Sequence, residues 1–133
     1  MSVTWAATSP ETGRFDGSER TTTTAALEGR FNALRSRGAG YLEVRLPGSE
    51  YPQLTLGFEG DRAVIHLFRD VEQVLLLAGD GSARADEVIE VPAMDEIAPF
   101  TGDYVRRTGS AWDRLRALLH KGSPSQLGDW VEL

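Results

Sequence analysis

The residues able to act as acids, bases or nucleophiles are few and far apart in this sequence. His66 lies in the apolar stretch AVIHLF, which favours a packed or edge-strand histidine. His120 follows a helical pattern, where it would complement the negative end of a helix. Cysteine is absent, which excludes disulfides, thiolate nucleophiles and cysteine-ligated metals. The HExxH and GxSxG strings of zinc and serine hydrolases do not occur.

Short motifs that resemble ligand-binding loops each lack a necessary part. Gly38-Ala39-Gly40 follows a helical pattern, whereas a dinucleotide loop precedes a helix so that the helix N-terminus faces the phosphate. Asp80-Gly81-Ser82 begins like a calcium loop, but Arg84 takes a position where an oxygen ligand is required. Adjacent acids such as Asp86–Glu87 and Asp95–Glu96 would point to opposite faces of a strand. We therefore expect no metal, no cofactor and no enzymatic activity.

The first half of the chain predicts one helix followed by three strands, and these elements would position any site. Leu27, Phe31 and Leu34 recur at helical spacing, after a threonine run that can cap the helix and before the glycines at 38 and 40. Alternating apolar residues then predict antiparallel strands over 41–46, 53–59 and 62–68, with a glycine turn between the last two. The third strand is apolar on both faces, which indicates a central position in the sheet.

The second half of the chain predicts more strands and one further helix. Residues 71–78 are interpreted as a strand, with a short helix as the alternative, while DEVIEV and the region around FTGDYVRR are expected to pair. In the second helix, Ser110 is expected to be the N-cap and Trp112, Leu115 and Leu119 the buried face. Gly122 and Pro124 would end it, and Trp130 lies in a terminal strand that would close the core.

The chain of 133 residues fits one domain. We expect an irregular segment over residues 1–21 and a single α+β domain over 22–133, with a mainly antiparallel sheet and two main helices packed on it. Trp5 is interpreted as a core residue, with an exposed binding anchor as the alternative. No signal peptide or membrane-spanning run is recognised, so a cytoplasmic location is expected.

Acidic residues gather in the middle of the chain. The net charge is −6, and the stretch from Glu59 to Asp103 holds eleven acids against three bases. Such a surface repels phosphate backbones, so direct nucleic-acid binding is not expected, and it suits either a cationic protein partner or a solvated face that aids solubility. Charge and loop position together select five candidate partner-binding residues: Glu59, Asp61, Asp70, Glu72 and Asp80.

Three stretches carry a family resemblance: YPQLTLGFEGDRAVIHLF, PFTGDYV and AWDRLRALLHKGSPSQLGDWVEL. In this order they resemble actinobacterial members of the Imm1 family of immunity proteins, over residues 22–133. The resemblance implies a non-enzymatic cytoplasmic protein that neutralises a cognate toxin, a nuclease or nucleic-acid deaminase, as a monomer or weak homodimer. A small-molecule-binding α+β domain and a homodimeric scaffold remain as alternatives.

Overall fold

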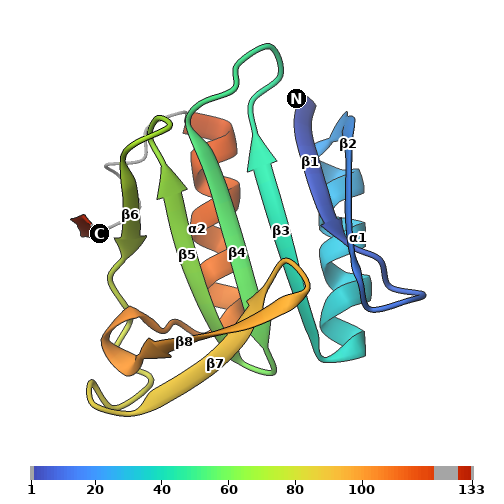
Figure 1. Cartoon of the computed structure of the whole chain (residues 1–133). Coiled ribbons are helices and arrows are strands. Elements are labelled where there is room, and N and C mark those ends of the chain that lie inside the picture. The colour runs from blue at the N-terminus through green and yellow to red at the C-terminus, as the bar shows by residue number, and fades with distance from the viewer. Residues whose placement is uncertain (1, 122–128, 133) are drawn as a thin grey trace.

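The structure is a computed structural model that describes residues 2–121 and 129–132. A seven-stranded antiparallel sheet in the order β2-β1-β3-β4-β5-β6-β9 carries both helices on one face and a two-stranded hairpin, β7–β8, on the other (Figure 1). The strands are β1 (Ser2–Thr8), β2 (Phe15–Thr23), β3 (Ala39–Arg45), β4 (Gln53–Glu59), β5 (Arg62–Phe68), β6 (Val74–Leu77), β7 (Val88–Ala93), β8 (Glu96–Thr101) and β9 (Trp130–Glu132). The helices are α1 (Thr24–Arg37), α2 (Thr108–Lys121) and a short 3-10 turn, η1 (Gly102–Tyr104). The predicted α+β class is confirmed.

The three central strands form as predicted. β3, β4 and β5 pair antiparallel in sequence order, and Gly60 occupies the β4–β5 turn with a φ of 58° that favours glycine. β5 is central, with β4 on one side and β6 on the other. Residues 71–78, for which a strand and a short helix were both considered, contain the strand β6, which pairs with the end of β5.

The expectation of an irregular segment over residues 1–21 is wrong. β1 is buried along nearly its whole length and lies between β2 and β3, so the domain extends back to Ser2. β2 is an edge strand whose side chains are largely exposed, and its polar sequence needed no apolar stripe to form a strand. Trp5 is a core residue, 4% exposed, and its Nε1 donates to Thr22 Oγ1 at 2.8 Å.

The main core lies between the sheet and the two helices. Leu27, Phe31 and Leu34 of α1 are buried as predicted, and so are Trp112, Leu115 and Leu119 of α2. The rings of Phe31 and Trp112 stack at 4.6 Å and join the two helices. Trp130 of β9 packs against this core from the edge and is partly buried.

The predicted cap of α2 is wrong, because the helix begins two residues before Ser110. The carbonyl of Arg107 accepts the first helical hydrogen bond, from Ala111 N, which places Ser110 within the first turn. The predicted stop at Gly122 and Pro124 lies outside the described residues. No helix within residues 2–121 and 129–132 is long and apolar enough to cross a membrane.

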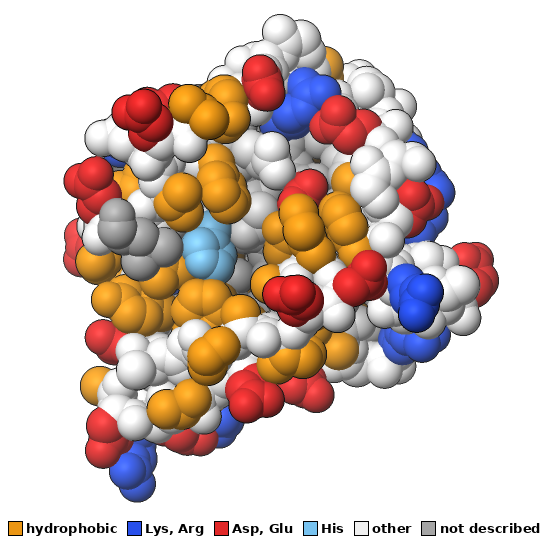
Figure 2. Space-filling view, viewed as in Figure 1, with side chains coloured by type: hydrophobic (Ala, Val, Ile, Leu, Met, Phe, Trp, Pro, Cys, Tyr) orange, Lys and Arg blue, Asp and Glu red, His pale blue; other side chains and the backbone are white. Residues whose placement is uncertain are grey.

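The face opposite the helices, called the front face here, is covered in part by the β7–β8 hairpin (Figure 1). Ile89 and Val91 of the hairpin are buried against Val64 and Leu76 of the sheet, forming a second core. The hairpin leaves the rest of this face open. Figure 2 shows a hollow there, with hydrophobic side chains on both sides and acidic side chains along its rim.

Replacing Trp112 by alanine is expected to cost about 3–5 kcal/mol of unfolding free energy, as truncation of a large core aromatic does. Trp112→Phe should cost much less, because phenylalanine keeps the ring against Phe31 and removes a buried indole N–H that has no hydrogen-bond partner among the described residues. Denaturant unfolding of both variants measures this. A loss below about 1 kcal/mol for Trp112→Ala would contradict a core role.

Candidate functional site

The five acids selected from the sequence divide into two groups. Glu59 and Asp61 lie at the β4–β5 turn, whereas Asp70 and Glu72 lie in the loop after β5. β5 separates the two groups by about 20 Å, at roughly 3.3 Å per residue of strand. Asp80 belongs with the first group, because Asp61 and Asp80 both bind Arg107. The structure therefore brings three of the five acids together and leaves two at the other end of the sheet.

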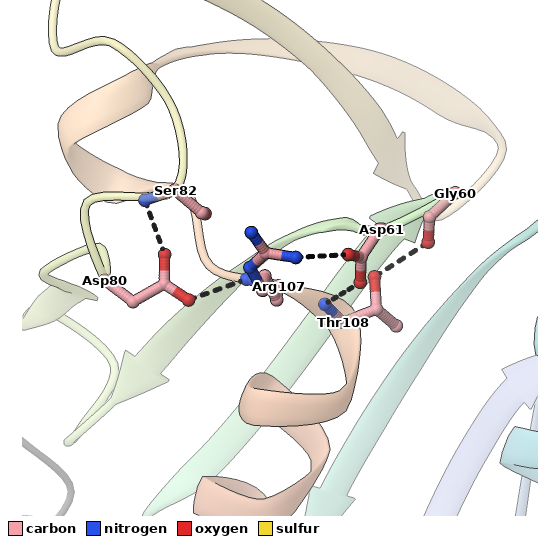
Figure 3. A network of polar contacts seen from close by, with 6 residues as sticks. All are labelled: Gly60, Asp61, Asp80, Ser82, Arg107 and Thr108. Atoms are coloured by element: carbon pink, nitrogen blue, oxygen red, sulfur yellow. Dashed lines mark hydrogen bonds and ion pairs between the residues drawn. The ribbon is translucent and has the colours of Figure 1, made fainter.

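Asp61 and Asp80 hold the N-terminus of α2 (Figure 3). Asp61 Oδ1 accepts from Thr108 N at 3.2 Å, and Asp80 Oδ2 accepts from Arg107 N at 3.0 Å. The hydroxyl of Thr108, itself fully buried, donates to Gly60 O at 2.8 Å. Because the first amides of a helix have no partner within the helix, these carboxylates supply the cap that a local serine does not.

Hydrogen bonds also set the ionisation of Asp80. Partial burial would raise the pKa of its carboxyl, but hydrogen bonds from Arg107 N and Ser82 N outweigh burial and hold the pKa below its usual range. Asp70 has a local role too, since its Oδ1 accepts from Glu72 N and Gln73 N at 2.8 Å. Of the five acids, only the side chains of Glu59 and Glu72 make no hydrogen bond or ion pair with a described residue.

The front face contains a small pocket that the sequence did not predict. The pocket holds about 160 Å³ and lies between β3, β4 and β5 of the sheet and the β7–β8 hairpin. Its walls are mainly apolar and aromatic, with contributions from Tyr41, Val64, His66, Phe68, Pro92 and Phe100. The only sequence signal for it was the apolar character of both faces of β5, which required a cover on the front face but did not show which segment supplies it.

His66 is the main polar group of this pocket. Its ring packs edge-on against Phe100 with centroids 5.3 Å apart, and more nearly parallel to Phe68 at 6.3 Å. Burial lowers the pKa of His66 to about 4, so the imidazole is neutral at pH 7. No described residue hydrogen-bonds to the imidazole. The expectation of a packed histidine is confirmed, and nothing in the described residues orients the ring for acid–base catalysis.

Beside the pocket, the hydroxyl of Tyr41 donates to Glu43 Oε2 at 2.9 Å. Burial raises the pKa of Tyr41, and the Glu43 carboxylate raises it further. Burial also raises the pKa of Glu43. In the described part of the chain, no group of three or more histidines and acids is placed to hold a metal ion. These neutral hydroxyl and imidazole groups in an apolar setting are suited to binding.

The outward surface of the β7–β8 hairpin is the second feature of the front face. Val88, Met94 and Ile97 are more than half exposed, and they are three of the five large hydrophobic side chains that the described residues expose. Residues 88–101 contain three acids and no lysine or arginine. The side chains of Glu90 and Glu96 make no ion pair with a described residue. The hairpin thus presents apolar and acidic side chains together.

Asp61→Ala is expected to lower the unfolding free energy by about 1–2 kcal/mol, as loss of a helix N-cap does. Asp61→Asn should recover part of this, because its amide oxygen can still accept from Thr108 N. Glu59→Ala is the control and should change stability by less than about 0.5 kcal/mol, since Glu59 is exposed and its side chain has no partner among the described residues. Equal stability of Asp61→Ala and Glu59→Ala would contradict the capping role.

His66 should make the protein less stable in acid. The pKa of His66 in the folded state is about 4, below the value of about 6.5 in an unfolded chain. The unfolded state therefore gains a proton first as the pH falls, and stability should decrease between about pH 6.5 and pH 4, by up to about 3 kcal/mol. His66→Phe should remove this component from the pH dependence of urea unfolding. The exposed His120→Gln is the control, and an unchanged pH profile for His66→Phe would contradict the prediction.

No protein-family model matches this chain, and no curated protein matches it. The resemblance to Imm1 immunity proteins therefore stays a prediction.

Proposed function

We propose that this protein is an immunity protein that binds a cationic toxin domain, a nuclease or nucleic-acid deaminase, in the cytoplasm and neutralises it by covering its active surface. The observation that carries the proposal is the β7–β8 hairpin, which has exposed apolar side chains, three acids and no base. Exposed apolar patches rimmed by polar groups mark interaction sites on soluble proteins. The acids select a partner of positive charge.

The acidic side chains of this protein would also attract a cationic toxin domain before contact. Toxins that act on nucleic acid need a cationic surface to grip phosphates, and an acidic inhibitor is attracted to that same surface over several ångströms in solution. The carboxylates of Glu59 and Glu72, beyond the two ends of β5, make no hydrogen bond or ion pair with a described residue, so they can add to the attraction. Asp61, Asp70 and Asp80 keep their local hydrogen bonds and contribute charge without needing to move.

The two alternatives have less support. Small-molecule sites are commonly mainly apolar and enclose about 300–1,000 Å³. The apolar pocket of the front face holds about 160 Å³, and the larger hollows on the described surface, of about 360 to 510 Å³, are open and lined in part by charged side chains. The hairpin of β4 and β5 lies inside the sheet and so has no free edge through which two copies could pair. Pairing through the β2 edge is opposed by the charged side chains Asp16, Glu19 and Arg20. We therefore propose a monomer that binds one toxin domain.

The test uses the toxin domain encoded by the neighbouring gene, with association followed by surface plasmon resonance and protection by growth of cells that express the toxin. Glu90→Gln with Glu96→Gln should slow association about tenfold or more at low salt and leave dissociation nearly unchanged, because rim charges act on the on-rate. Val88→Ser with Ile97→Ser should instead speed dissociation and reduce protection.

The matched control is Glu28→Gln with Asp113→Asn, which removes the same charge from the helix side of the sheet. Its association rate should stay close to that of the unchanged protein, apart from the small effect of net charge. If the hairpin variants bind and protect as well as this control, the hairpin is not the interface. If the neighbouring gene encodes no toxin that the protein binds, the immunity function itself is contradicted.

A further inference from the structure

We propose that the front-face pocket receives one phenol ring, the side chain of a tyrosine on the bound toxin domain, with the hydroxyl of that tyrosine hydrogen-bonded to His66. This proposal rests on the proposed function, because the tyrosine belongs to the partner protein. It adds a specific anchoring site to the hairpin surface. Four features of the pocket support it: its size, its walls, its polar group and the charge of its surroundings.

The size of the pocket fits a single six-membered ring. The pocket holds about 160 Å³. An apolar protein cavity of about 150 Å³ accommodates benzene, whereas drug-sized ligands fill about 300 Å³ or more. An indole or a nucleotide would exceed this volume, and a short aliphatic side chain would leave part of it empty. One benzene-type ring is the best match.

The walls favour an aromatic occupant. Tyr41, Phe68 and Phe100 place aromatic rings around the pocket, and Val64 and Pro92 complete an apolar surface. Aromatic rings gain about 0.5–1.5 kcal/mol from edge-to-face or offset contacts, beyond the burial of area. Phe68 and Phe100 are only partly buried, so their rings remain available to such a contact.

The polar requirement of the pocket selects a phenol over a plain benzene ring. The imidazole of His66 is held among aromatic rings without a hydrogen bond to any described residue. The ring nitrogens are not among the buried polar atoms without a partner, so water reaches them in the free protein, and a bound hydroxyl would take the place of that water. A neutral imidazole carries one donor and one acceptor nitrogen, and a phenol hydroxyl can satisfy either of them.

The surroundings of the pocket agree with a tyrosine that is flanked by basic residues. A polar depression of about 510 Å³ adjoins it through Glu43, the acceptor of the Tyr41 hydroxyl. Glu19, Glu43 and Glu50 line this depression, with Arg45 as its one base, and Arg45 is already paired with Glu19. The net negative charge beside an apolar pocket matches a tyrosine next to lysine or arginine on a cationic surface.

The first experiment tests the pocket without the toxin. p-Cresol, which is the tyrosine side chain as a free molecule, is titrated into the whole protein while NMR follows the ring protons of His66 and the methyl groups of Thr55 and Val64. Saturable shifts at these groups are expected. Toluene, which lacks the hydroxyl, should bind about two- to tenfold more weakly, the value of one neutral hydrogen bond. Butylguanidinium, a mimic of arginine, should produce no saturable shift at His66.

Two variants test the assignment within the protein. Ala93→Leu adds bulk to a half-buried wall residue and should abolish the p-cresol shifts, while Val71→Leu, at a site 81% exposed and outside the pocket, should leave them unchanged. His66→Phe should keep binding of the ring but remove the preference for p-cresol over toluene. If Ala93→Leu fails to fold, His66→Phe still decides the outcome, because loss of that preference requires only a folded pocket.

The outcomes separate this proposal from the proposed function. If p-cresol gives no saturable shift, or butylguanidinium binds better, the tyrosine site is overturned. If the toxin domain binds folded Ala93→Leu as tightly as the unchanged protein, the site is overturned while the immunity function stands. If p-cresol binds as expected and the toxin domain does not bind at all, the pocket stands and the immunity function fails. Weakened toxin binding by Ala93→Leu, through faster dissociation, supports both.

Discussion

The front face depends on one close approach of two backbones, between Gly57 in the middle of β4 and Pro92 in β7. A Cβ atom at Gly57 would clash with the carbonyl oxygen of Pro92, so the hairpin can lie directly on the sheet only where β4 has no side chain. A second close approach joins the two segments that flank the hairpin, where a Cβ at Gly102 of η1 would clash with the carbonyl of Arg84 in the loop before β7. The hairpin surface and the pocket beneath it both follow from this contact.

The sheet is consequently buried on two sides that have different roles. On the helix side, Phe58, Ile65 and their neighbours pack against α1 and α2 in a continuous apolar core. On the front side, the hairpin covers Val64 and Leu76 but leaves His66 at the border between covered and open sheet. A polar residue at such a border is desolvated without being enclosed, which explains both its lowered pKa and its access to a ligand.

The parts of the fold that could be predicted from sequence are those set by local pattern. The alternation in β3, β4 and β5 and the spacing of Leu27, Phe31 and Leu34 depend on burial of one stripe, which the sequence displays. β2 was not predicted, because an edge strand needs no apolar stripe. β1 was not predicted either, because the apolar alternation of Val3, Trp5 and Ala7 is short and a polar segment follows it. The cap of α2 was not predicted, because the carboxylates that form it, Asp61 and Asp80, come from loops distant in the sequence. The local motif at Ser110 therefore predicted the wrong cap. The pocket depends on which residues of different strands share a row, and no single segment contains that information.

The tip of the hairpin has one more attachment, which bears on the entropy of association. Asp95 Oδ1 accepts a hydrogen bond from Phe15 N at 2.7 Å, and this bond ties the hairpin to the N-terminal strand pair. Together with the crossing at Gly57, where Pro92 lies near the end of β7, it holds the tip of the hairpin at two points. A protein that docks on this surface meets side chains on a backbone already held in place. Little backbone freedom remains to be lost on binding, so more of the contact energy appears as affinity.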